Sequence, residues 1–158
     1  MKVYIFCLAL FGVAFGEVAK FTRCDESNDD ICEVKEVRVT PCNAGAATCA
    51  LTLGSESSIE FDFVPKFAAS QLTSTLFWAS PGGDVPFSEF SNVAACAYTS
   101  CPTQPDVQQQ LAYSLRLSKK LPTGKFTFKW QLWDANDKSK KCCFKTNVKL
   151  LKDRKTHK

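Results

Sequence analysis

The sequence contains almost no histidine. Its one histidine, His157, is the penultimate of 158 residues and lies among lysines in a polar tail. Ser-His-Asp and Cys-His catalytic centres need an imidazole held in a structured site, which a tail residue does not provide. No spacing singles out a carboxylate pair either. We therefore assign no catalytic residue and keep a small secreted hydrolase as the lower-ranked alternative.

Long apolar runs are also scarce, with one exception at the N-terminus. The run from Val3 to Phe15 follows Lys2 and ends in Ala14-Phe15-Gly16, a small-x-small pattern that signal peptidase accepts. Residues 1–16 are therefore predicted to be a signal peptide. A membrane anchor is the alternative, but a spanning helix needs roughly 20 apolar residues. The mature chain is expected to be soluble and secreted, with the endolysosomal lumen as a second destination.

The cysteines lack the spacing of a metal site. No Cys-x-x-Cys pair occurs, and the tail histidine is a poor ligand, so no metal or other cofactor is expected. Cys7 leaves with the signal peptide, and an even set in a secreted chain is typical of disulfides. Eight cysteines can pair in 105 ways. The eight are Cys24, Cys32, Cys42, Cys49, Cys96, Cys101, Cys142 and Cys143.

A helical period of 3.6 is missing, and the apolar residues alternate with period two instead. The clearest alternating runs are 49–53, 59–63, 111–117 and 126–132, and residues 71–79 are rich in Thr, Leu, Phe and Trp. Turn signals such as Pro81-Gly82-Gly83 and Pro122-Thr123-Gly124 separate them. Six to eight half-buried strands predict one all-β sandwich over residues 17–151, followed by a basic tail at 152–158.

Two cysteines are adjacent in the stretch KKCCFK at 140–145. Neighbouring side chains of a strand point to opposite faces, so Cys142 is expected to face the core and Cys143 to face outward. A β-bulge between Val34 and Val37 would place Cys32 on an inner face. Cys32 could then reach Cys142, which leaves Cys143 for Cys24. Other pairings remain open at this point.

Four disulfides exceed what a sandwich of about 140 residues needs for stability. An empty cavity of about 300 Å³ would cost roughly 7 kcal/mol at about 24 cal/mol per Å³, and disulfides of about 2–4 kcal/mol each could offset it. We therefore expect a sandwich that is hollow between its sheets.

A set of short motifs runs through nearly the whole mature chain in a fixed order. They are Lys35-Glu36-Val37-Arg38-Val39-Thr40-Pro41-Cys42, Cys49-Ala50-Leu51, Val85-Pro86-Phe87, Cys96, Ser100-Cys101-Pro102, Leu121-Pro122, Trp130-Gln131-Leu132-Trp133-Asp134, and Cys143-Phe144-Lys145 before Val148. In this order the chain resembles the MD-2-related lipid-recognition (ML) domain family. It is most similar to the Niemann-Pick type C2 sterol-carrier branch, with further likeness to arthropod members and mite group 2 allergens.

The resemblance implies an immunoglobulin-like sandwich of two antiparallel sheets with a lipid held between them. It also implies the disulfides Cys24–Cys143, Cys42–Cys49 and Cys96–Cys101, which leave Cys32–Cys142 as the fourth pair. Phe87, Leu117 and Leu121 match positions that line the family's cavity, although sterol carriers commonly have Tyr in place of Leu121. The candidate lining is extended to other apolar residues of the strands and the mouth: Val85, Phe61, Phe63, Phe126, Phe128 and Trp130.

The expected function is to hold and transfer a sterol, a fatty acid or a similar hydrophobic molecule. The loop from Pro81 to Phe90 and the turn at 121–124 would form the mouth. The alternative is innate-immune recognition of a microbial glycolipid by the same fold. A net charge of +4, concentrated late in the chain, suggests transient contact with an anionic membrane or a receptor, although a solvated face is the simpler reading. Nucleic acid is not an expected partner, and the protein is expected to be a monomer.

Overall fold

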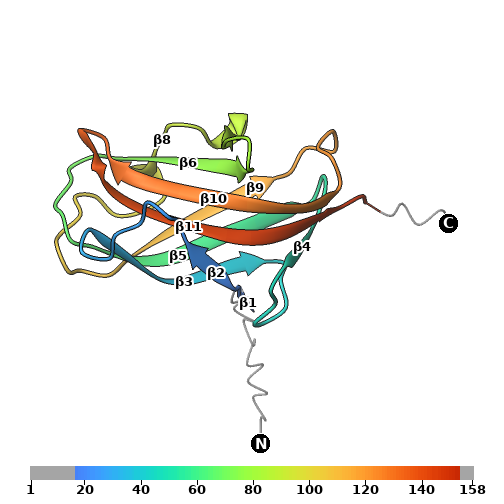
Figure 1. Ribbon diagram of the computed structural model, residues 1–158, viewed down its shortest axis with the longest axis horizontal. Helices are drawn as coiled ribbons and strands as arrows, with labels where there is room; N and C mark the ends of the chain where they lie inside the picture. The colour runs from blue at the N-terminus through green and yellow to red at the C-terminus, as the bar shows by residue number, and fades with distance from the viewer. Residues whose placement is uncertain (1–16, 154–158) are drawn as a thin grey trace, which may run out of the picture.

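The alternating runs form strands in the computed structural model, which describes residues 17–153 (Figure 1). Two single-turn 3₁₀ helices, η1 (Ser88–Phe90) and η2 (Ala95–Ala97), interrupt them. The predicted signal peptide and residues 154–158 of the predicted tail lie outside the described residues. The strands are β1 (Glu17–Val18), β2 (Phe21–Arg23), β3 (Cys32–Thr40), β4 (Cys49–Thr52), β5 (Glu56–Pro65), β6 (Leu72–Ala79), β7 (Val85–Pro86), β8 (Val93–Ala94), β9 (Gln109–Arg116), β10 (Gly124–Asp134) and β11 (Asp137–Leu151).

The strands make two sheets that pack face to face, as the sequence predicted. One sheet has four strands in the order β1-β3-β5-β9. The other has the path β2-β11-β10-β6-β7, with β8 pairing β6 and β4 pairing β11. All pairings are antiparallel except that of β4 with β11, which is parallel. Figure 1 shows the two layers, with β6, β10 and β11 in one and β3 and β5 in the other.

The predicted bulge in β3 is confirmed. The register against β5 shifts between Val34 and Glu36, so that Lys35 has no partner opposite it. The shift brings the two halves of the strand into phase, and their apolar side chains all face the core. The buried residues on this face are Cys32, Val34, Val37 and Val39.

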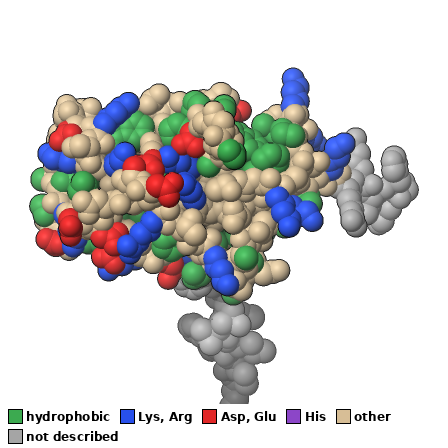
Figure 2. Space-filling model, viewed as in Figure 1, with side chains coloured by type: hydrophobic (Ala, Val, Ile, Leu, Met, Phe, Trp, Pro, Cys, Tyr) green, Lys and Arg blue, Asp and Glu red, His purple; other side chains and the backbone are tan. Residues whose placement is uncertain are grey.

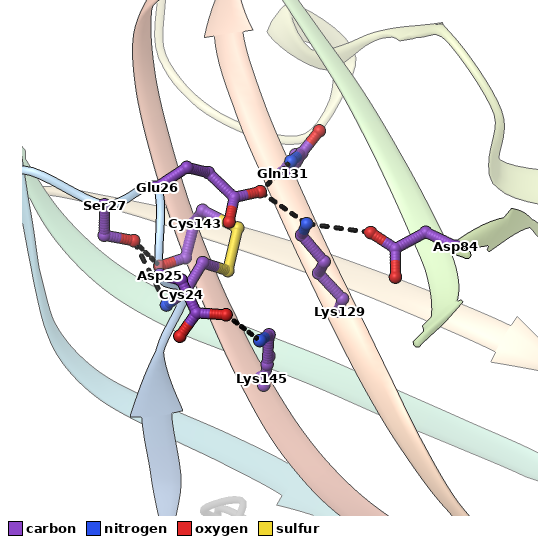
Figure 3. The surroundings of a disulfide bond; sticks show 9 residues. All are labelled: Cys24, Asp25, Glu26, Ser27, Asp84, Lys129, Gln131, Cys143 and Lys145. Atoms are coloured by element: carbon purple, nitrogen blue, oxygen red, sulfur yellow. Dashed lines mark hydrogen bonds and ion pairs between the residues drawn. A yellow bond between two sulfur atoms is a disulfide. The ribbon is translucent and has the colours of Figure 1, made fainter. Parts of the chain in front are cut away.

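Four disulfides join the eight cysteines of the described residues. The pairs are Cys24–Cys143, Cys32–Cys142, Cys42–Cys49 and Cys96–Cys101, the same four as those given by the resemblance and the facing argument. Cys142 lies in the core and Cys143 on the opposite face of β11. Cys143 is nevertheless only 3% exposed, because the segment at 24–27 covers it and the Ser27 hydroxyl donates to its carbonyl (2.9 Å; Figure 3).

Aromatic side chains fill part of the space between the sheets. Phe61 packs against Phe63, Trp130 and Phe144, with ring centroids 5.0–5.7 Å apart. The indole Nε1–H of Trp130 donates to the Ser74 hydroxyl (2.8 Å), so its polar atom is satisfied in the core. These aromatic residues therefore pack as core, and any cavity between the sheets lies beside them. Within residues 17–153, no helix is long and apolar enough to cross a membrane.

Candidate functional site

An apolar pocket of about 260 Å³ lies between the sheets, at the open edge of β9. The four-stranded sheet ends at β9, and the other sheet ends at β7, so no ladder closes this side of the sandwich. Its lining comes from β6, β9, η1 and the turns beside them. The lining residues are Leu76, Phe87, Glu89, Phe90, Tyr113, Ser114, Leu115, Arg116, Leu117, Ser118 and Leu121.

The backbone of β9 supplies polar groups at this pocket. Ala112 donates its N–H away from β5, to Tyr98 (3.1 Å), whereas the Leu117 carbonyl accepts from Gly54 on the β5 side (2.7 Å). Peptide groups alternate in direction along a strand, so those of Ser114 and Arg116 face the open edge. This explains how residues with exposed side chains line an apolar pocket. A ligand with an apolar body and a polar end finds both kinds of partner here.

Phe87 forms one wall of the pocket. Its ring stacks on Trp78 (4.6 Å between centroids) and meets Phe128 edge to face (5.1 Å). The pairing of β7 with β6 continues into the hydrogen bond from the Phe87 N–H to the Leu76 carbonyl (2.8 Å), which fixes the backbone. Phe87 is therefore a packed wall that is 6% exposed, rather than a loose gate.

The structure brings together three of the nine candidate lining residues. Phe87, Leu117 and Leu121 all line the pocket, although they come from three separate segments. Phe61, Phe63 and Trp130 lie in the aromatic cluster, which adjoins the pocket because Trp130 contacts Phe90 (4.6 Å between centroids). Phe126 and Phe128 pack against Trp78 behind the Phe87 wall, and Val85 points to solvent with 59% of its surface exposed.

Sequence reasoning missed several lining residues. The alternation along 111–117 placed Tyr113 and Leu115 on the same face as Leu117, so these two could have been found. No sequence signal indicated that η1 would bring Phe90 against Tyr113, with ring centroids 4.1 Å apart. Burial, with smaller contributions from Tyr98 and Glu89, raises the pKa of Tyr113, so its hydroxyl stays protonated at neutral pH.

A charged cluster on the outer face joins the first disulfide to the loop that precedes Phe87 (Figure 3). The Lys129 ammonium contacts both Glu26 and Asp84 (2.8 Å to the latter), and Lys129 is 7% exposed. Burial opposes its charge, but the hydrogen bonds to Asp84 and Glu26 raise the pKa of Lys129 overall. Acidic and basic side chains meet in the middle of this face in Figure 2. The cluster thus ties Asp84 to the sheet.

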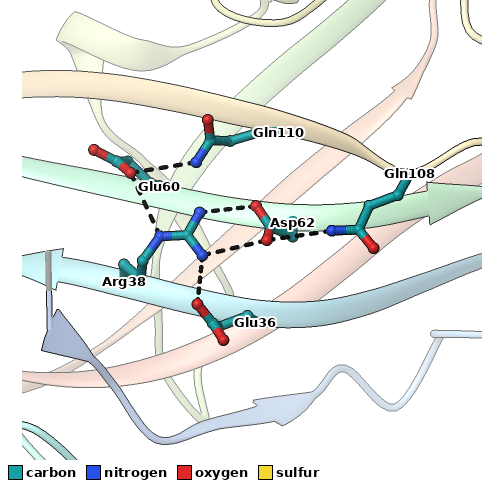
Figure 4. A network of polar contacts seen from close by, with 6 residues as sticks. All are labelled: Glu36, Arg38, Glu60, Asp62, Gln108 and Gln110. Atoms are coloured by element: carbon teal, nitrogen blue, oxygen red, sulfur yellow. Dashed lines mark hydrogen bonds and ion pairs between the residues drawn. The ribbon is translucent and has the colours of Figure 1, made fainter. Parts of the chain in front are cut away.

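Two other acidic groupings do not offer a metal site. Cys24, Glu26 and Cys143 lie close together, but both sulfurs are committed to a disulfide and cannot act as thiolate ligands. On the outer face of the four-stranded sheet, Arg38 occupies the centre of a carboxylate cluster (Figure 4). Its guanidinium binds Asp62 through two nitrogens (2.8 and 3.3 Å) and also contacts Glu36 and Glu60.

Comparisons with known proteins give a consistent result. Residues 18–150 match the family model of the ML domain. The chain is 45% identical over 150 residues to an MD-2-related lipid-recognition protein of Manduca sexta, covering 94% of this chain and 97% of that one. Among solved structures it resembles a Niemann-Pick type C2 protein from the Japanese carpenter ant, with a TM-score of 0.72 at 18% identity. That match covers 84% of this chain and 99% of the ant chain.

Proposed function

The chain belongs to the ML domain family, and from this premise we propose that it carries one slender hydrophobic molecule, a fatty acid or a sterol, in the pocket beside β9. The observation that supports this proposal is the joint lining of Leu76, Phe87, Phe90, Leu117 and Leu121, which comes from both sheets. Burial of the ligand's apolar surface would drive binding at about 25 cal/mol per Å². No bond is made or broken.

The size of the pocket favours a single chain over a large glycolipid. A volume of about 260 Å³ lies near the lower limit of about 300 Å³ that is usual for the pockets of small ligands. Several acyl chains need more room, and the aromatic cluster of Phe61, Trp130 and Phe144 blocks extension toward the other end. The proposal therefore ranks lipid carriage above immune recognition of a microbial glycolipid.

The polar end of the ligand would lie at the open edge of β9. The N–H and C=O groups of Ser114 and Arg116 face this edge and can bind a hydroxyl or a carboxyl group there. The Arg116 side chain donates to the Gly54 carbonyl (3.0 Å) and leaves the edge accessible. Entry and exit would take place between β9 and the turn that carries Leu121.

The disulfides support secretion as part of the proposal, because such bonds persist in oxidising compartments. A carrier in this setting would act as a monomer and exchange its ligand at membranes or with a receptor. The basic residues of the late part of the chain are the proposed contact for an anionic membrane. If the amount of protein that co-sediments with vesicles does not depend on their anionic lipid content or on the salt concentration, this contact is excluded.

Native mass spectrometry of the secreted, oxidised protein, followed by lipid extraction, tests the carrier proposal directly. A bound mass that matches a fatty acid or a sterol supports it and chooses between them. A bound glycolipid would replace it with the immune-recognition alternative. A bare protein that also rejects added fatty acid and sterol would contradict it.

A variant that fills the pocket tests whether the ligand binds there. Leu121 is half-buried at the mouth, so Leu121→Trp should occupy part of the cavity and weaken binding of a fluorescent fatty acid at least tenfold. Leu151→Trp is the matched control, because Leu151 lies on the surface outside the pocket. Equal affinity of the two variants would show that the ligand binds elsewhere.

A further inference from the structure

A second hollow lies on the outer face of the seven-stranded sheet, separate from the lipid pocket between the sheets. Its volume is about 260 Å³, and it is bounded by the β10–β11 hairpin on one side and the segment 86–92 on the other. We call it the outer groove. Its lining residues are Thr75, Phe77, Pro86, Ser91, Asn92, Gln131, Trp133, Lys138 and Lys141.

Two lysines of the outer groove have no anionic partner among residues 17–153. The neighbouring lysines on this face do: Lys129 contacts Glu26 and Asp84, Lys140 contacts Asp134 and Asp137, and Lys145 contacts Asp25. No ion pair forms at Lys138 or Lys141 within that range. The charge of Lys141 acts on the Glu26 carboxylate, but that carboxylate is already bound by Lys129 and Gln131. The groove therefore keeps two positive charges available to a ligand.

Trp133 holds one of these charges in place. Its side chain points outward from β10 but is only 6% exposed, and the Lys138 ammonium lies 5.2 Å from the ring centroid. A cation over an indole face is attracted by the ring quadrupole, which restricts where the ammonium can lie. Lys138 is thus oriented at the groove before any ligand arrives.

The remaining lining suits a sugar ring better than a bare anion. Phe77 and Pro86 offer apolar surface. The amide oxygens of Gln131 and Asn92 and the Ser91 hydroxyl offer polar groups, while the Gln131 N–H donates to Glu26 (3.0 Å) and the Asn92 side-chain N–H to Ser91 (3.4 Å). A sugar presents both C–H faces and hydroxyls, so it can use all of these partners at once. Figure 2 shows hydrophobic side chains reaching the surface beside basic ones near the turn between β10 and β11. A flat bilayer cannot enter such a hollow.

We propose that the outer groove binds an acidic carbohydrate, with its sulfate or carboxylate between Lys138 and Lys141 and its ring against Phe77 and Pro86. The charge-assisted hydrogen bonds to the anion supply most of the affinity. The hydroxyls of the sugar then select it over inorganic sulfate. This assignment stands independently of what the lipid pocket binds.

One segment of the chain, residues 85–92, separates the groove from the lipid pocket and lines both. In the segment 85–92, Pro86, Ser91 and Asn92 face the groove, whereas Phe87, Glu89 and Phe90 line the pocket. The Asn92 N–H donates to the Thr75 hydroxyl (2.8 Å), which fastens the segment to β6. A sugar that holds this segment should change lipid affinity, and by thermodynamic reciprocity lipid should change sugar affinity by the same factor. This coupling alone rests on the proposed carrier function.

Titration calorimetry with a sulfated heparin disaccharide tests the site. We expect binding that weakens with salt, at least tenfold tighter than that of inorganic sulfate or of uncharged cellobiose. The double variant Lys138→Gln/Lys141→Gln should lose at least tenfold in affinity. Lys125→Gln/Lys149→Gln is the control, because it removes the same charge from an exposed cross-strand pair outside the groove, and it should stay within twofold.

Several results would overturn the proposal. Equal losses in the two double variants would indicate general charge attraction, and equal binding of sulfate and disaccharide would indicate a bare anion site. Binding of anionic phosphatidylserine vesicles through Lys138 and Lys141, without disaccharide binding, would assign the surface to membranes. If the affinity for fatty acid is the same with and without saturating disaccharide, the coupling through the segment 85–92 is refuted. Failure of Leu121→Trp to affect lipid binding would instead concern the carrier function only.

Discussion

The two disulfides that end at Cys142 and Cys143 should stabilise the fold in a strongly non-additive way. Alone, Cys32–Cys142 closes a long loop, since its cysteines are 110 residues apart. When Cys24–Cys143 is present, the ring is much shorter. It then contains only the residues from Cys24 to Cys32 and the adjacent pair Cys142 and Cys143, about eleven residues in all.

The chain-entropy relation turns these loop sizes into free energies. A ring of about eleven residues is worth about 2.8 kcal/mol, and a loop of about 110 residues is worth about 4.8 kcal/mol. Replacing either cysteine pair by alanine should therefore cost about 2.8 kcal/mol while the other bond remains. Replacing both pairs should cost about 7.6 kcal/mol, which exceeds the sum of the single losses by about 2 kcal/mol.

The assay is urea unfolding of four proteins: the wild type, Cys32→Ala/Cys142→Ala, Cys24→Ala/Cys143→Ala and the quadruple variant. The same concentration of trimethylamine N-oxide in all samples keeps a folded baseline for the weakest protein. Packing losses at the buried cysteines occur in both the double and the quadruple variants, so they cancel in the cycle. Additivity within about 0.5 kcal/mol would refute the reasoning.

Three further predictions concern the core, the charged cluster and the pocket. Ser74→Ala should destabilise the fold by about 1–3 kcal/mol in chemical unfolding, because it leaves the buried Trp130 N–H without its acceptor; Ser58→Ala on the outer face should be neutral. Burial works against the charge of Glu26, but its hydrogen bond from Lys129, its backbone hydrogen bond and the charges of Lys129 and Lys141 lower its pKa below 4.5. Its stabilising contribution is therefore complete above about pH 4.5 and is lost as the pH falls through the lowered pKa. The free energy of unfolding of Glu26→Gln should therefore fall less steeply with decreasing pH than that of Glu17→Gln. In displacement assays with saturated fatty acids, each added methylene should tighten binding by about 0.8 kcal/mol, or about fourfold, until the pocket is full; affinity independent of chain length would contradict burial in the pocket.

The sequence was informative wherever one local pattern sufficed. Alternation in 111–117 and 126–132 assigned inner and outer faces, and an inner-face position for Cys32 required the bulge in β3. Adjacent cysteines on opposite faces of β11 indicated two separate bonds. These inferences hold because strand geometry fixes the direction of each side chain with a period of two.

Alternation along the strands did not distinguish core residues from cavity-lining residues. Phe61, Phe63 and Trp130 do face inward, as alternation requires, but inward-facing aromatic residues can fill a core or line a cavity. They fill it, because Phe144 from β11 packs against Phe61 and closes the space. Val85 does not face the interior, because a two-residue strand at a sheet edge leaves alternate side chains in solvent.

What the sequence determined by itself is most of the strands and their buried faces, since these depend on local periodicity, whereas the partners of the cysteines were implied by the family resemblance. Only the tertiary structure decided where the pocket lies. The pocket depends on which sheet edges remain unpaired, on the direction of the β9 peptide groups, and on η1 folding back to place Phe90 against Tyr113. Each of these brings together segments that are distant along the chain, and distance along the chain leaves no periodic trace in a sequence.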